Sequence, residues 1–86
     1  MGTKTVPAGG TNPLVSPRRA VADKDGNLYV ADPEAGRVFV FETGGTLMRS
    51  ISPAKVSHFR PTDIELDASN GIYVTDTANA SVFVFK

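Results

Sequence analysis

The chain has 86 residues, which is one small domain at the lower end of what buries a self-sufficient core. Nine basic side chains balance nine acidic ones, so composition gives no electrostatic argument for a nucleic-acid or anionic-membrane surface. The absence of cysteine excludes disulfides and thiolate zinc sites, and no apolar run approaches the roughly 18 residues of a membrane span.

The predicted elements are all β-strands, because no segment keeps helical periodicity and Gly and Pro recur at short intervals. Along the chain we predict strands at Arg19–Asp23, Leu28–Ala31, Arg37–Glu42 and Thr46–Ile51. After a connection over Ser52–Arg60, three more are predicted at Asp63–Asp67, Ile72–Thr75 and Ser81–Lys86. Short strands separated by frequent turn signals predict a meander of antiparallel hairpins.

These strands come from one motif that occurs twice. Residues Pro17–Phe41 align without a gap on Pro61–Phe85, a shift of 44 positions (from 17 to 61), and both copies end in Val-Phe-Val-Phe. A period in the forties of strand-like sequence is typical of a β-propeller, in which each repeat is one small sheet, a blade. We therefore predict an all-β fold with two four-stranded antiparallel blades per chain, assigned as residues 17–51 (blade 1) and 61–86 (blade 2), with 52–60 as their connection.

The repeat resembles the NHL repeat, a blade of usually six-bladed β-propellers, over residues 17–51 and 61–86. In blade 1 the resemblance is carried by Pro17, Asp23, Gly26, Leu28, Tyr29, Val30, Asp32, Arg37, Val38 and Phe41. In blade 2 it is carried by Pro61, Asp67, Gly71, Ile72, Tyr73, Val74, Asp76, Asn79, Val82 and Phe85. Two features depart from the family pattern. The family's Asp-x-x-Asn-x-Arg turn is split between the copies, since blade 1 has only the Arg (Arg37) and blade 2 only the Asn (Asn79). The turn glycine also shifts by one repeat position, from Gly26 to Gly71. The resemblance implies the fold and leaves the function open, since this fold carries both scaffolds and enzymes.

The last shared strand of each copy is apolar on both faces. Because side chains alternate along a strand, Val38 and Val40 lie on one face and Phe39 and Phe41 on the other. The same alternation in blade 2 separates two valines from two phenylalanines, namely Val82 and Val84 from Phe83 and Phe85. A strand of this kind needs cover on both faces. Two blades alone are expected to leave one bare face each.

Self-association can supply the missing neighbours. Blade 2 lacks a fourth strand, and Gly2–Val6 in the N-terminal strand and linker (residues 1–16) is similar to Gly45–Arg49. We therefore predict that a neighbouring chain completes blade 2 with the strand formed by Thr3, Lys4, Thr5 and Val6. The favoured ring is a homotrimer whose six blades fall in the range of roughly four to eight that closes a propeller, and other ring sizes stay open. A fragment of a longer protein or an engineered minimal propeller is the competing interpretation.

Four aspartates precede turns, and we assign them structural roles. Asp32 and Asp76 each begin the turn after the second strand of a repeat, where a carboxylate accepts hydrogen bonds from backbone amides nearby. Asp23 and Asp67 end the first strand of each repeat, and the same reasoning applies. We therefore predict no catalytic, cofactor-binding or metal-binding residue among them.

The aromatic and imidazole side chains also favour structural roles. Tyr29 and Tyr73 lie among apolar neighbours, which favours core packing with a hydrogen-bonded hydroxyl. His58 is the single histidine, in the connection between blades, and we expect it to be exposed to solvent.

Charged residues occupy the first strand of each repeat, which lines the central channel of a propeller. Arg18 and Arg19 occur in blade 1, whereas Asp63 and Glu65 occur in blade 2. We interpret them as ion pairs around a water-filled channel, since charges near the axis need partners. The alternative interpretation is a polar funnel for a charged ligand.

The favoured function is a non-catalytic β-propeller scaffold that self-assembles from identical two-blade chains into a closed ring, without a cofactor; protein binding is expected of such a scaffold, but a protein or small-molecule partner is unknown. The alternative is an enzyme of lyase or lactonase type, formed only on assembly, with a metal held on the axis by Asp63 or Glu65. Nucleic-acid binding is disfavoured because the candidate basic residues are scattered, namely Arg18, Arg19, Arg37 and Arg49. Residues 1–13 contain one lysine and no apolar segment, so we expect a soluble chain without a signal peptide, of unknown compartment.

Overall fold

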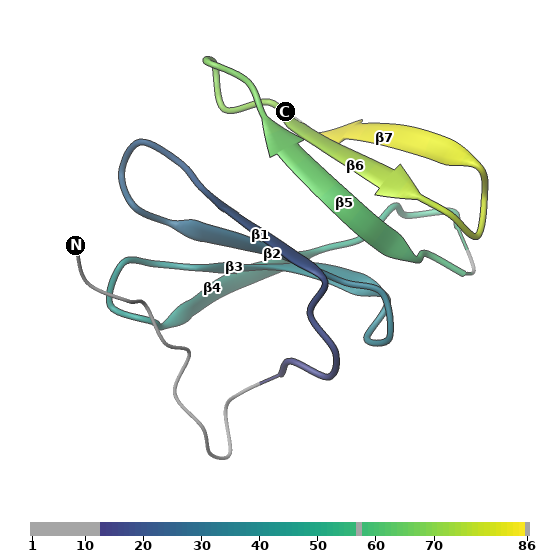
Figure 1. The fold of residues 1–86 in the computed structure, drawn as a ribbon, viewed down its shortest axis with the longest axis horizontal. Helices are drawn as coiled ribbons and strands as arrows, with labels where there is room; N and C mark the ends of the chain where they lie inside the picture. Colours follow the sequence, from purple (N-terminus) through teal and green to yellow (C-terminus); the bar gives the residue numbers. More distant parts are fainter. Residues whose placement is uncertain (1–12, 57, 86) are drawn as a thin grey trace.

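The computed structural model describes residues 13–56 and 58–85, which form two antiparallel β-sheets (Figure 1). Blade 1 contains β1 (Arg19–Ala22), β2 (Leu28–Asp32), β3 (Arg37–Phe41) and β4 (Leu47–Ile51). Blade 2 contains β5 (Pro61–Leu66), β6 (Ile72–Asp76) and β7 (Ser81–Phe85). In both sheets each strand pairs with the next one along the chain, so the all-β meander is confirmed.

The predicted strands are all present, with bounds that differ by one or two residues. Blade 2 has three strands within the described residues, which agrees with the assignment of residues 61–86 as a blade that lacks its fourth strand. The predicted exchanged strand, Thr3–Val6, lies outside the described residues.

The first hairpin of each blade explains why the turn glycine shifts between copies. The left-handed conformation falls at the same repeat position, on Gly26 (φ 85°) and on Asn70 (φ 65°), and asparagine is among the residues that adopt it most readily. At the following position, Asn27 donates its side-chain amide to the Asp23 carboxylate at 3.1 Å. In blade 2 that space is closed, because a Cβ at Gly71 would lie 2.6 Å from Oδ2 of Asp67. The two blades therefore form the same turn, with Gly-Asn in blade 1 and Asn-Gly in blade 2.

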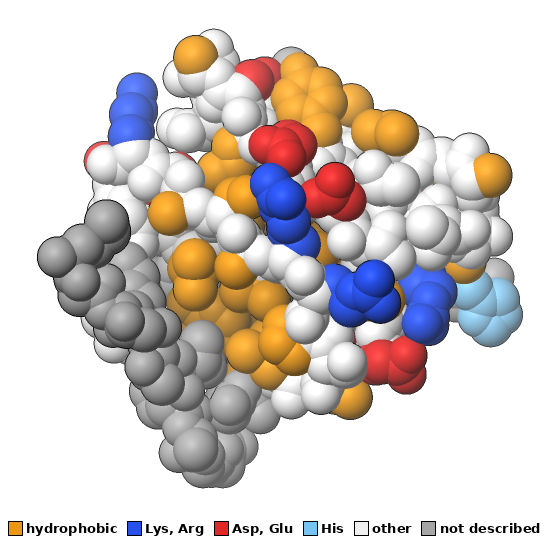
Figure 2. All heavy atoms as spheres, in the orientation of Figure 1, with side chains coloured by type: hydrophobic (Ala, Val, Ile, Leu, Met, Phe, Trp, Pro, Cys, Tyr) orange, Lys and Arg blue, Asp and Glu red, His pale blue; other side chains and the backbone are white. Residues whose placement is uncertain are grey.

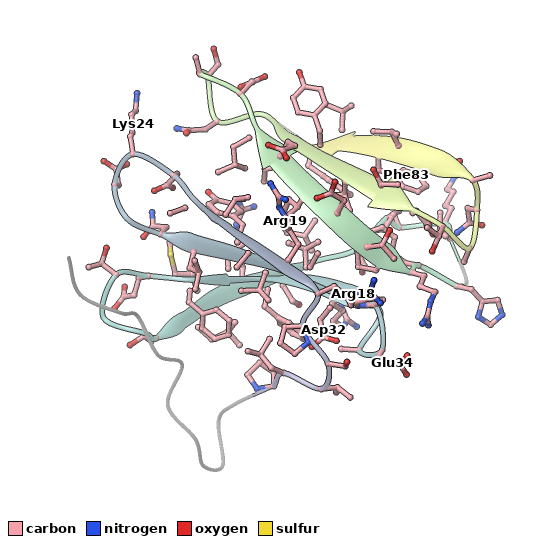
Figure 3. All side chains as sticks on the ribbon, in the orientation of Figure 1. Arg18, Arg19, Lys24, Asp32, Glu34 and Phe83 are labelled. Carbon is pink, nitrogen blue, oxygen red and sulfur yellow. The ribbon has the colours of Figure 1, made fainter. Side chains whose placement is uncertain are left out.

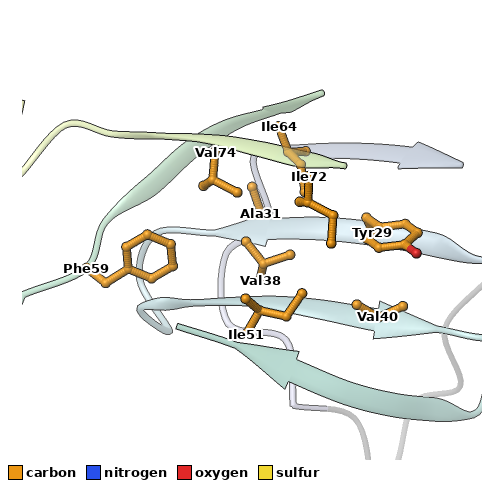
Figure 4. Packing of buried hydrophobic residues seen from close by; sticks show 9 residues of the cluster. All are labelled: Tyr29, Ala31, Val38, Val40, Ile51, Phe59, Ile64, Ile72 and Val74. Atoms are coloured by element: carbon orange, nitrogen blue, oxygen red, sulfur yellow. The ribbon is translucent and has the colours of Figure 1, made fainter. Parts of the chain in front are cut away.

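The two sheets stack face to face around a shared apolar core (Figure 4). Blade 1 contributes Tyr29, Ala31, Val38, Val40 and Ile51, and blade 2 contributes Ile64, Ile72 and Val74. Phe59, in the connection, closes one end of this core and meets Phe83 edge to face, with ring centroids 5.9 Å apart. Burial on both sides of the junction fixes the two sheets against each other.

The blades use opposite faces at this junction. We define the forward face as the side that carries Val38 in blade 1 and Val82 in blade 2, and the back face as the side that carries Phe39 and Phe83. Val38 belongs to the shared core, and Phe83 packs against it from blade 2. The back face of blade 2 therefore covers the forward face of blade 1. This head-to-tail stacking is how successive blades follow one another around a propeller.

The two outer faces of the pair differ. On blade 2 the forward face is open, and Val82 and Val84 are 62% and 48% exposed. On blade 1 the back face is buried, because Leu14, Leu28 and Ala35 pack against a cluster of Val30, Phe39 and Phe41. The expectation of one bare face on each blade is therefore correct for blade 2 and wrong for blade 1. Leu14, from the segment that precedes β1, supplies part of the cover that sequence reasoning missed.

Candidate functional site

The seam between the blades carries a charge cluster centred on Arg19. Its Nε lies 3.4 Å from Oδ1 of Asp63, and its Nη2 lies 2.8 Å from Oε2 of Glu65. Arg19 extends from β1 toward β5 (Figure 3), and acidic and basic side chains adjoin one another across this face of the molecule (Figure 2). All three side chains are about half exposed, so solvent screens the pairs and each contributes little stability. Their geometry nevertheless fixes which charges meet at the seam.

Arg18 does not join this cluster. Its backbone amide donates to the carbonyl of Ala31 at 2.9 Å, and neighbouring side chains on a strand point to opposite faces. Within residues 13–56 and 58–85, the ion pairs at the seam involve Arg19 and Arg60. The structure therefore brings together three of the four predicted channel residues.

A second ion pair spans the junction at its other end. Arg60, from the connection, donates through Nη2 to Oε2 of Glu34 in the β2–β3 turn at 3.0 Å. It borders a hollow of about 430 Å³ that is also lined by Arg37, Ser52 and His58. His58 is exposed there, and Arg37 donates to the Ser52 hydroxyl at 3.3 Å. Sequence reasoning missed this pair, because Glu34 and Arg60 lie 26 residues apart and no local pattern links them.

The buried carboxylates of Asp32 and Asp76 bind backbone amides. Asp32 accepts hydrogen bonds from the amides of Val15 (2.7 Å), Ser16 and Ala35 (both 3.1 Å). Asp32 therefore connects the segment before β1 to the β2–β3 turn.

Asp76 binds the matching groups in blade 2. It accepts from the amide of Arg60 at 3.1 Å and from the side-chain amide of Asn79 at 2.6 Å. Burial alone would raise the pKa of Asp76, but the hydrogen bonds from Asn79, Arg60 and Ala78 outweigh it and lower that pKa. The carboxylate is therefore held ionised by its structural partners.

A second pair of carboxylates closes the first turn of each blade. Asp23 accepts from the amides of Asp25 and Asn27, both at 2.9 Å, and from the Tyr29 hydroxyl at 3.3 Å. Burial would raise the pKa of Asp23, and these bonds together lower it. In blade 2 the Tyr73 hydroxyl donates to Asp67 at 2.9 Å, which raises the pKa of Tyr73 because the bond favours the protonated phenol.

Comparison with known families bears on the second repeat. A family model described as NHL repeat matches residues 60–85, the stretch that forms β5, β6 and β7. Blade 2 is similar to an NHL repeat. No curated protein matches the chain. Blade 1 forms the same first three strands in the same order as the matched repeat.

Within the part of the chain that the structure describes, no group of three or more His, Asp or Glu side chains is placed to hold a metal ion. Over the same residues, no helix is long and apolar enough to cross a membrane. The features that stand out are the charged seam and the open forward face of blade 2.

Proposed function

We propose that this chain is a non-catalytic scaffold that self-assembles from identical two-blade chains into a closed propeller ring. One observation carries the proposal. Val82 and Val84 are 62% and 48% exposed, whereas Val38 and Val40, at the equivalent positions of blade 1, are 0% and 1% exposed beneath blade 2. The favoured ring is a homotrimer, whose six blades fall in the range of roughly four to eight that closes a propeller.

Closure removes the cost of the open face. Burying exposed apolar area contributes about 25 cal/mol per Å², and a ring gives every blade a neighbour on each side. Hydrogen bonding supports the same conclusion, because β3 pairs with β4 while β7 is an edge strand within the described residues. An open edge beside an apolar face favours pairing with another chain. In the ring, Thr3–Val6 of a neighbour would pair with β7.

The alternative of an axial metal held by Asp63 or Glu65 has less support. Both carboxylates are bound by the guanidinium of Arg19, at 3.4 and 2.8 Å. A metal ion there would have to compete with a fixed cation for the same oxygens.

The deciding experiment is the mass of the chain in solution, by sedimentation equilibrium across a wide concentration range. We expect a single closed species, with three times the mass of one chain favoured. A mass that stays at one chain at every concentration would overturn self-assembly. Continuous growth without a discrete species would overturn ring closure.

A further inference from the structure

The junction between the two blades occurs once inside the chain, and the side chains that build it are present a second time on the outside. We propose that the open forward face of blade 2 binds the back face of blade 1 from a second copy of this chain, in the register that the two blades adopt within one chain. This inference rests on the proposed self-assembly and specifies the contact that would produce it.

The apolar surfaces of the proposed contact repeat those of the internal one. On the forward face, four residues of blade 1 (Tyr29, Ala31, Val38, Val40) correspond to Tyr73, Thr75, Val82 and Val84. On the back face, four residues of blade 2 (Ile72, Val74, Phe83, Phe85) correspond to Leu28, Val30, Phe39 and Phe41. Among these positions only Ala31 and Thr75 differ in polarity. A surface that fits the back face inside the chain is therefore offered again to a second copy.

The charges at the seam select the head-to-tail arrangement. In the internal junction Arg19 of blade 1 meets Asp63 of blade 2. Arg19 and Asp63 occupy equivalent repeat positions. The proposed contact therefore places Asp63 of one copy against Arg19 of the next, so that the acidic residue takes the place of the basic one and the charges still attract. A two-fold contact between identical forward faces would instead bring Asp63 and Glu65 of both copies together. Like charges at an interface disfavour that arrangement.

Val15 and Ser16, just before β1, are already placed for this contact. Ser16 donates its amide to Asp32 as Arg60 donates its amide to Asp76, both at 3.1 Å, so the chain leads into both blades along the same path. The preceding residue differs in burial: Phe59 is 7% exposed between the blades, and Val15 is 67% exposed. The forward face of a second copy would cover Val15 as the forward face of blade 1 covers Phe59.

The proposed contact is weaker than the internal junction for two reasons. The Glu34–Arg60 ion pair has no counterpart, since Ala78 and Ser16 occupy those positions, and neither has the Arg19–Glu65 pair, since Val21 occupies the position of Glu65. The back face of blade 1 is also already buried, with Leu14 packed against the cluster that contains Phe39. Leu14 must move aside before a second copy can seat there. We therefore expect association to depend on concentration rather than to be permanent.

Cysteine cross-linking tests the contact directly, because the natural chain contains no cysteine. Ala78→Cys and Ser16→Cys are made in separate chains, at the positions equivalent to Glu34 and Arg60. The two variants are mixed and treated with a short bismaleimide. We expect a covalent dimer in the mixture and little in either variant alone. The control replaces Ser16→Cys with Lys24→Cys, at the opposite end of blade 1 from Asp32 (Figure 3).

The outcomes separate the contact from self-assembly. Cross-linking of Ala78→Cys chains with one another, or equal yields with the Lys24→Cys control, would overturn the head-to-tail contact. If the mass shows an oligomer while the mixture gives no cross-link, the contact is wrong and self-assembly stands. If the mass shows one chain at every concentration, both are wrong. Circular dichroism of each variant confirms that it remains folded before the yields are compared.

Discussion

Asp76 and Asn79 are joined by a short side-chain hydrogen bond, with 2.6 Å between Oδ2 and Nδ2. Asn79 uses the same amide group to donate to the carbonyl of His58 at 2.7 Å. The β6–β7 turn of blade 2 is therefore tied to the connection through one asparagine and one buried carboxylate. Blade 1 holds its own leading segment through Asp32 without an asparagine, since Ala35 stands at the equivalent position.

Asp76→Asn should destabilise the fold. If one oxygen keeps the amides of Arg60 and Ala78, the new NH₂ group faces the NH₂ of Asn79, and two donors meet in a buried site. A buried polar group left without its partner costs about 1–3 kcal/mol, and we expect a loss of that size in urea unfolding. Asp25→Asn, in an exposed turn, is the matched control and should change stability little. Equal effects of the two substitutions would contradict the role of Asp76.

Acid should destabilise the fold once the pH falls below about 3.8. The pKa values of Asp23 and Asp76 lie below the ordinary value of 3.8, so the folded state binds these protons less readily than the unfolded state. The stability that they contribute is complete above pH 3.8 and is lost as the pH falls through the lowered folded values. Circular dichroism in a pH titration, with urea unfolding at each step, measures this loss. Stability that rises as the pH falls from 4 to 2 would contradict it.

Gly71→Ala should be more damaging than Gly44→Ala. A Cβ at position 71 would lie 2.6 Å from the Asp67 carboxylate, while a Cβ at position 44 meets nothing within 4 Å. Overpacking of this kind costs about 1–3 kcal/mol, so Gly71→Ala should lower the urea midpoint clearly. Gly44→Ala, at an open position, should be close to neutral. The prediction fails if the two variants unfold at the same urea concentration.

Val84→Lys should weaken association without unfolding the chain. Fully burying a valine contributes about 1.5–3 kcal/mol, and an interface can bury only the 48% of Val84 that is exposed, so its loss weakens binding roughly three- to tenfold. Ala68→Lys is the control, because Ala68 is exposed in the β5–β6 turn and blade 1 carries Lys24 at the equivalent position. Sedimentation of both variants at matched concentrations measures the difference. If both variants dissociate equally, Val84 does not lie in the interface.

Ser16→Arg combined with Ala78→Glu should strengthen association. The pair recreates between chains the ion pair that Glu34 and Arg60 make within one chain at 3.0 Å. An exposed pair of this kind contributes about 0.2–1 kcal/mol, which corresponds to an affinity gain of up to about fivefold that high salt removes. The two single variants serve as controls and should show no such gain. A gain in either single variant as large as in the double variant would contradict the pairing.

The sequence repeat was sufficient for most of the fold. Alternation along Val-Phe-Val-Phe placed Val38 and Phe39 on opposite faces, and turn chemistry placed the hairpins, because both depend on neighbours within a few residues. Contacts over long separations were harder. Which of Arg18 and Arg19 meets Glu65 depends on the registry of β1 against β5, and the cover that Leu14 gives Phe39 depends on the path of an irregular segment. Neither contact has a local pattern that could predict it.

The stacking of unlike faces gives the molecule a direction. A chain that adds to another through its back face presents a fresh forward face, so every addition regenerates the same pair of surfaces. A symmetric dimer would bury the exposed apolar face of both chains at once. Head-to-tail addition stops only when the last chain binds the first. The tilt of one blade against the next therefore decides the outcome: a tilt that closes yields a finite ring, and one that misses yields a fibre.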